Sequence, residues 1–145
     1  MTNIPAGYQL SISTWENDYD NYKTETLNGL TSEDVQFYIC FLNYFKRKGF
    51  GNETVDSETI GIEERIAITE AYNQYPPSSP ELLERVQSSL ADWKDNPNES
   101  HDWITDLIGF WNDGEYYRVI EKIDVHYVPQ VIEDVTQQFR PLGCL

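Results

Sequence analysis

The chain has 145 residues, of which 39% are hydrophobic and 14% aromatic, enough apolar material for one core of the commonest domain size. This composition argues against an intrinsically disordered acidic chain, because such chains are usually poor in the aromatic and β-branched groups whose burial offsets conformational entropy. The 25 acidic side chains against 10 basic ones leave a formal net charge of −15, which argues against binding of nucleic acid through its phosphates.

Two strands are predicted at the start of the chain. From Tyr8 to Trp15 the sequence YQLSISTW alternates side chains with the period of two that is typical of a strand. The Thr-rich segment 22–27 follows a turn-like stretch and ends at Asn28-Gly29. We therefore expect the two strands to pair as a hairpin or meander.

A helix is predicted from Thr31 to Lys48. Thr31 is a good N-cap, and Asp34 follows three residues later, as in a capping box. Two rows of apolar side chains then recur at helical spacing, with Val35, Tyr38, Ile39, Leu42 and Phe45 in one and Phe37, Cys40, Phe41 and Tyr44 in the other. Because most of its circumference is apolar, we expect this helix to lie across a sheet and to be covered by another element.

Three further helices are expected in the middle of the chain. Apolar spacing favours a helix over 63–75, although 65–68 also fits a strand. Ser79-Pro80-Glu81 is a strong helix start, and this helix should end near Asp95. Ser100 can cap the next helix, which would carry Trp103, Leu107, Ile108 and Trp111.

Strands return at the end of the chain. Residues 117–127 alternate with a period of two, and Pro129 separates them from a last strand expected over 131–139. Strands first, helices in the middle and strands last predict a single α+β domain over 1–145. Its mostly antiparallel sheet would be formed by the N- and C-terminal strands, with the helices packed on one face.

Signatures of catalysis or metal binding are weak in the sequence. His101 and Asp102 are neighbours on a helix start and should not face one another, so we expect His101 to be a surface group of the first turn. His126 has no second His or Cys spaced to share a metal with it. Asp18 to Lys23 resembles half of a calcium loop, but Lys23 stands where the loop requires Gly. We therefore expect no metal and no cofactor.

The acidic side chains gather in three stretches that also contain Tyr and Trp. Residues 16–34 hold six acidic groups against Lys23, residues 53–70 hold six against Arg65, and residues 92–115 hold seven against Lys94. Aromatic side chains anchor protein interfaces, while aligned opposite charge accelerates encounter. A merely solvated acidic surface is the alternative. The candidate partner-binding residues are Glu16, Asp18, Tyr19, Asp20, Glu63, Glu64, Asp102, Asp106, Asp113 and Glu115.

A family resemblance also favours a protein that binds a partner. The opening YQLSISTWENDYDNYKTETLNGL and the following TSEDVQFYICFLNYFKRKGFGNE resemble the immunity proteins of bacterial contact-dependent growth inhibition and other polymorphic toxins. The resemblance covers about the first 55 residues together with size and charge, and it assigns no functional residue. It implies a small acidic cytoplasmic protein that binds one cognate toxin domain, often a basic nuclease, and blocks its active site.

Two other functions stay open at this point. A phage-type DNA mimic that inhibits a defence protein would also need acidic side chains, but spaced along an elongated face. A small carboxylate-based enzyme is the third possibility, because acidic pairs such as Glu63-Glu64 or Asp113-Glu115 say little about catalysis without geometry.

The compartment is inferred from absent patterns. The opening MTNIPAGYQL has neither the basic nor the apolar part of a signal peptide, and no stretch approaches the length of a membrane span. We expect a cytoplasmic protein that contacts neither membrane nor nucleic acid. Its oligomeric state does not follow from these patterns.

Overall fold

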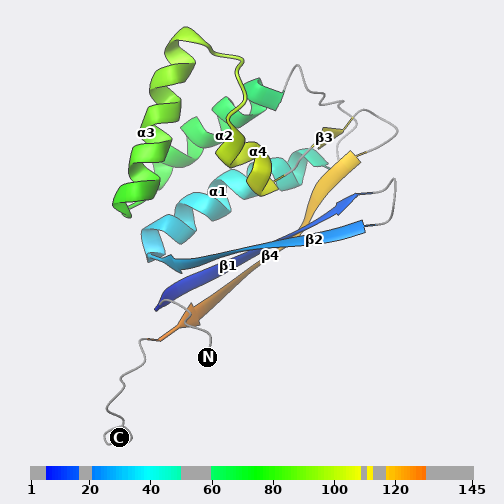
Figure 1. Cartoon of the computed structure of the whole chain (residues 1–145), viewed down its shortest axis with the longest axis vertical. Coiled ribbons are helices and arrows are strands. Elements are labelled where there is room, and N and C mark those ends of the chain that lie inside the picture. Colours follow the sequence, from blue (N-terminus) through cyan, green and yellow to red (C-terminus); the bar gives the residue numbers. More distant parts are fainter. Residues whose placement is uncertain (1–5, 17–20, 50–59, 109–110, 113–116, 130–145) are drawn as a thin grey trace, which may run out of the picture.

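The computed structural model describes residues 6–16, 21–49, 60–108, 111–112 and 117–129 and combines one sheet with four helices (Figure 1). The strands are β1 (Gly7–Glu16), β2 (Asn21–Leu30), β3 (Trp111–Asn112) and β4 (Tyr117–Val128). The helices are α1 (Ser32–Gly49), α2 (Ile60–Gln74), α3 (Pro80–Asp95) and α4 (Asp102–Ile108). The protein has an α+β fold, as the order of the predicted elements indicated.

The sheet is antiparallel and has the strand order β2-β1-β4-β3. β1 lies between its hairpin partner β2 and the distant β4, so the N-terminal and C-terminal strands meet in the centre of the sheet. Leu10 and Ile12 of β1 point into the core and are fully buried. The opposite face of β1 and β2 is a ladder of hydroxyl groups, in which Ser11 contacts Thr26 and Ser13 contacts Thr24.

Helix α1 lies on the sheet, and α2 and α3 lie farther from it (Figure 1). Phe37, Phe41, Leu42 and Phe45 of α1 are all fully buried. The two apolar rows of this helix therefore both have partners, and the prediction of a helix covered on both sides is confirmed. The core also takes side chains from α2, α3, α4 and the two long strands.

The start of α1 is joined to the start of α3 by Asp34. Its carboxylate accepts a hydrogen bond from the Thr31 N–H, and its own N–H donates to the Thr31 hydroxyl, both at 3.1 Å. This is the predicted capping box. The same carboxylate accepts hydrogen bonds at 3.0 Å from the N–H groups of Ser78 and Ser79, just before α3.

Two details of the C-terminal part differ from the sequence-based prediction. Trp111 does not continue the preceding helix, because α4 ends at Ile108 and Trp111 begins β3. β4 does not alternate regularly either: Ser13 pairs with Lys122 but Thr14 pairs with Ile120, so Glu121 is the extra residue of a β-bulge. The last strand expected over 131–139 lies outside the described residues.

Within the described part of the chain, no helix has both the length and the apolar character that crossing a membrane requires. The longest, α1, carries acidic residues in its first turn and includes the basic segment 46–48 near its end.

Candidate functional site

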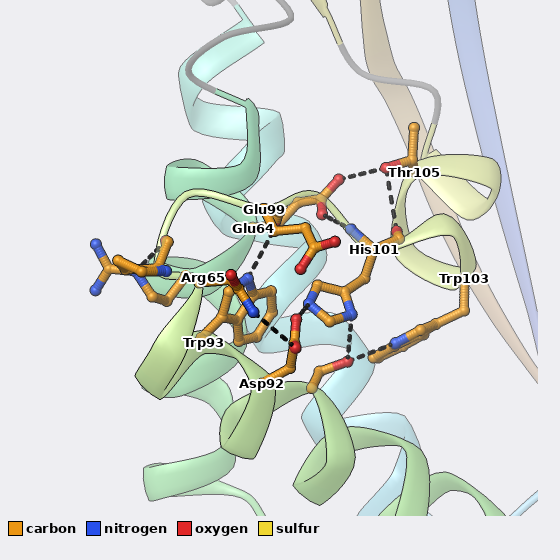
Figure 2. A network of polar contacts seen from close by, with 11 residues as sticks. Glu64, Arg65, Asp92, Trp93, Glu99, His101, Trp103 and Thr105 are labelled. Atoms are coloured by element: carbon orange, nitrogen blue, oxygen red, sulfur yellow. Dashed lines mark hydrogen bonds and ion pairs between the residues drawn. The ribbon is translucent and has the colours of Figure 1, made fainter.

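A network of polar side chains fills the junction of α2, α3 and α4 (Figure 2). Its innermost member is Glu64 of α2, which is fully buried. The Glu64 carboxylate accepts hydrogen bonds from the Thr105 hydroxyl at 2.6 Å and from the His101 N–H at 2.8 Å. Burial raises the pKa of Glu64, and these two hydrogen bonds act in the opposite direction. Glu64 therefore ties α2 to the start of α4.

The imidazole of His101 is held in one orientation by its neighbours. Its Nδ1 atom lies 3.2 Å from the Ser89 hydroxyl, which also accepts a hydrogen bond from Trp103 Nε1 at 2.9 Å. The Trp93 ring meets the imidazole edge to face, with 4.6 Å between the ring centroids. Trp93 Nε1 in turn donates to the backbone oxygen of Glu99 at 2.7 Å. Two tryptophans and a serine thus fix both the ring and the segment that carries it.

The other ring nitrogen of His101 faces two carboxylates. Nε2 lies 3.2 Å from Asp92 Oδ2, and the carboxylate of Glu99 points to the same region (Figure 2). Asp92, Glu99 and His101 each present one potential ligand atom, and these three atoms lie within 4.8 Å of one another. The hydrogen bond to Asp92 and the negative charge of that side chain raise the pKa of Glu99. Among the described residues, this is the one group that could hold a metal ion.

A groove of about 440 Å³ opens beside the network. Its walls include Glu81, Glu84 and Arg85 from the outer face of α3, together with His101 and Trp103. The Arg85 guanidinium lies over the Trp103 ring, 5.9 Å from its centroid, so this cation is partly engaged within the protein. Two acidic side chains, one cation and one aromatic ring thus contribute to the walls of the groove.

A second hollow, of about 660 Å³, lies between α1 and α2. Cys40, Arg47, Glu70 and Tyr75 contribute to its walls. Burial raises the pKa of the Cys40 thiol, with a smaller contribution from Glu70, so the thiol keeps its proton at neutral pH. A protonated thiol is a poor nucleophile, and the negative charge of Glu70 in the same hollow disfavours the thiolate further.

The candidate partner-binding residues occupy different environments. Glu16 is mostly buried and forms an ion pair with Arg118, at 3.2 Å. Glu63 is half-buried and accepts a hydrogen bond from the Tyr44 hydroxyl. Glu64 is internal, so it does not present its carboxylate to a partner.

The remaining candidates fall into two sets. Asp102 and Asp106 are exposed and lie one turn apart on α4, beside the polar network. Asp18, Tyr19, Asp20, Asp113 and Glu115 lie outside the described residues.

Sequence reasoning missed the importance of His101. It predicted a surface group of the first turn that does not face Asp102, whereas the side chain is only 17% exposed and faces Asp92 of the preceding helix. The missed signal is the stretch Asp92 to His101, in which three acidic residues and a histidine flank the breaker Asn96-Pro97-Asn98. A chain reversal at that breaker brings the ends of the stretch together.

Comparisons with protein families, with curated proteins and with solved structures gave no match for this chain.

Proposed function

We propose that the protein binds a basic protein domain in the cytoplasm and acts as the immunity protein of a cognate toxin, whose active site it blocks. The single observation that carries the proposal is an acidic surface at the α3–α4 corner. We define the acidic corner as the carboxylates of Asp92, Asp95, Glu99, Asp102 and Asp106.

Charge and exposure support this assignment. Lys94 is the one basic residue between positions 92 and 106, and Asp95, Glu99, Asp102 and Asp106 are all exposed. Clustered charge of one sign raises the rate of encounter with an oppositely charged protein. The adjoining groove adds the half-buried ring of Trp103, an aromatic side chain of the kind that anchors interfaces.

Two arginines are engaged in contacts within the protein. Arg118 pairs with Glu16 inside the protein, and Arg65 donates from Nε to the backbone oxygen of Pro97 at 2.8 Å. These cations are therefore turned toward the protein's own acceptors. A basic partner meets a surface on which acidic groups predominate.

The experiment uses the cognate toxin domain that the proposal requires, sought among the genes next to that of this protein and purified as a catalytically inactive variant. Binding is measured at low and high NaCl, between about 20 mM and about 500 mM, a range over which the screening length falls severalfold. We expect the association rate to fall steeply as salt rises. An association rate that does not change over this range would contradict an electrostatic interface.

Two double variants locate the interface. Asp102→Lys with Asp106→Lys reverses the exposed face of α4, while Glu70→Lys with Glu121→Lys makes the same change in net charge at exposed positions elsewhere. The first pair should weaken binding by about tenfold or more, equivalent to at least 1.4 kcal/mol, and should abolish protection of cells that express the active toxin. If the control pair weakens binding as much as the first pair, the acidic corner is not the contact surface.

A further inference from the structure

The second feature of the α3–α4 corner is the arrangement of its possible ligand atoms. Asp92 stands in the last turn of α3, Glu99 and His101 follow the chain reversal, and all three direct a ligand atom to one point (Figure 2). Glu99 is exposed and Asp92 is partly exposed, while the Nε2 atom of His101 is hidden from solvent. The point is therefore closed on the protein side and open toward water.

The contact between His101 and Asp92 has the spacing of two ligands of one ion. Nε2 lies 3.2 Å from Asp92 Oδ2, yet this buried nitrogen forms no hydrogen bond with acceptable geometry. Two ligand atoms of a tetrahedral zinc ion, each about 2.0–2.1 Å from the metal, lie about 3.3 Å apart, and each points to the ion rather than to the other ligand. A buried ring nitrogen without a hydrogen bond is costly, and a metal bond would satisfy it.

The surroundings of His101 match those of a metal-ligating histidine. Such a histidine normally uses its second ring nitrogen to donate a hydrogen bond that fixes its tautomer and orientation. Here Nδ1 meets the Ser89 hydroxyl, whose oxygen Trp103 Nε1 also approaches. With the proton on Nδ1, the Ser89 oxygen accepts hydrogen bonds from His101 Nδ1 and from Trp103 Nε1. The Nε2 atom is then left with a free lone pair that points toward the carboxylates.

We propose that Asp92, Glu99 and His101 bind one divalent transition-metal ion, with zinc as the best fit. One imidazole with two carboxylates suits zinc and its neighbours in the first transition row, whereas calcium and magnesium prefer oxygen ligands alone. Three protein ligands leave a fourth position open to water. The bound ion joins the end of α3 to the segment that enters α4 and neutralises two carboxylates that otherwise repel one another.

The first test is a titration of the metal-free protein with zinc chloride. Calorimetry measures the binding, and NMR records the signals of the histidine rings during the titration. We expect saturable binding of one ion per chain and a rise in the unfolding temperature, because a ligand that binds the folded state stabilises it. The chain has only two histidines, and His126 is exposed on β4. The His101 ring signals should therefore shift while those of His126 stay in place, and magnesium should not reproduce the effect.

Matched variants decide the ligand set. Glu99→Gln removes an exposed ligand, and Glu121→Gln makes the same change at an exposed position on β4. We expect Glu99→Gln to weaken zinc binding by more than about tenfold, because losing even a residue that only hydrogen-bonds to a ligand costs about that much. Glu121→Gln should leave zinc binding unchanged.

Three results would overturn the assignment. They are no saturable binding up to about 1 mM zinc, equal shifts of both histidines, and Glu99→Gln binding zinc as tightly as the unaltered chain. These measurements need no partner protein, so they can fail while the proposed toxin interface stands, and the reverse also holds.

Discussion

At the residue scale, the carboxylate of Asp34 holds two helix starts together. It accepts hydrogen bonds from the N–H groups of Thr31, Ser78 and Ser79 and from the Ser79 hydroxyl. Burial raises the pKa of Asp34, but the four hydrogen bonds outweigh it, and the pKa lies below the ordinary value of 3.8. The ionised form is the one that the fold stabilises, because a carboxylate accepts more hydrogen bonds than its protonated form.

Replacing Asp34 with Asn should lower the free energy of unfolding by about 2–3 kcal/mol at pH 7, as expected for lost hydrogen bonds to a charged group. The amide nitrogen of Asn would also face donors that now meet an oxygen. Because the folded-state pKa is depressed, the contribution of Asp34 is fully present above the unfolded pKa and is lost as pH falls through the lower folded value.

Urea denaturation of the unaltered protein and of Asp34→Asn measures this contribution. The difference between their free energies of unfolding should therefore be large at pH 7 and shrink below pH 3.8. The control is Glu84→Gln at an exposed position of α3, which should change stability by no more than about 0.5 kcal/mol. An Asp34→Asn effect that is independent of pH would show that shape rather than charge matters at this position.

At the scale of elements, α2 approaches the α3–α4 connection so closely that only glycine fits at the contact. Gly61 is buried, and a Cβ atom added there would lie 2.0 Å from the backbone oxygen of Asn98 and 2.7 Å from the carbonyl carbon of Glu99. No real Cβ atom tolerates such contacts. The two backbones can therefore pack at this distance only without a side chain.

Gly61→Ala should destabilise the protein by about 1–3 kcal/mol, the usual cost of overpacking. On an exposed helix the same change raises stability by about 0.8–1 kcal/mol. A loss of stability in Gly61→Ala would therefore show that the two backbones are in close contact. Thermal unfolding measures it, with Ser88→Ala on the exposed face of α3 as the control. A more stable Gly61→Ala protein would mean that α2 and the connection are farther apart.

Helix α1 should be the element least tolerant of change, because its side chains face both the sheet and α2. Leu42 is fully buried, so Leu42→Ala should cost about 2–5 kcal/mol through lost burial and the cavity that remains. Gln36→Ala, at an exposed position of the same helix, is the matched control. Unchanged urea midpoints for both variants would show that this side of α1 is not in the core.

Elements with a strong local period could be predicted from the sequence, and contacts between distant segments could not. The alternation in β1 and the apolar rows of α1 reflect burial on defined faces, which a single segment records in its own spacing. The link from Glu64 to Thr105 spans 41 positions and leaves no local pattern. The approach of His101 to Asp92 differs, because the chain reversal at Asn96-Pro97-Asn98 lies between the two residues and is visible in the sequence. The bulge at Glu121 breaks a period that looked regular.

At the scale of the whole molecule, negative charge dominates. The formal net charge is −15, and the ion pairs Lys23–Glu25 and Lys122–Asp124 are exposed at 3.9 Å and 3.5 Å, where such pairs contribute little stability. Self-repulsion of this size destabilises the compact state. A surface that costs stability is consistent with selection for fast capture of a basic partner, which is the property that the proposed function requires.

Screening this repulsion should stabilise the protein. In the presence of a chelator, we expect raising NaCl from about 20 mM to about 500 mM, which shortens the screening length severalfold, to raise the unfolding temperature. A gain of about 1 kcal/mol corresponds to about 4 °C for a domain of this size. Glu70→Lys combined with Glu121→Lys makes the net charge less negative at exposed positions, so this variant should start from a higher unfolding temperature and respond less to salt. An unfolding temperature that falls as salt rises would mean that attractive ion pairs outweigh repulsion, and the excess of acidic groups would then carry no cost to the fold.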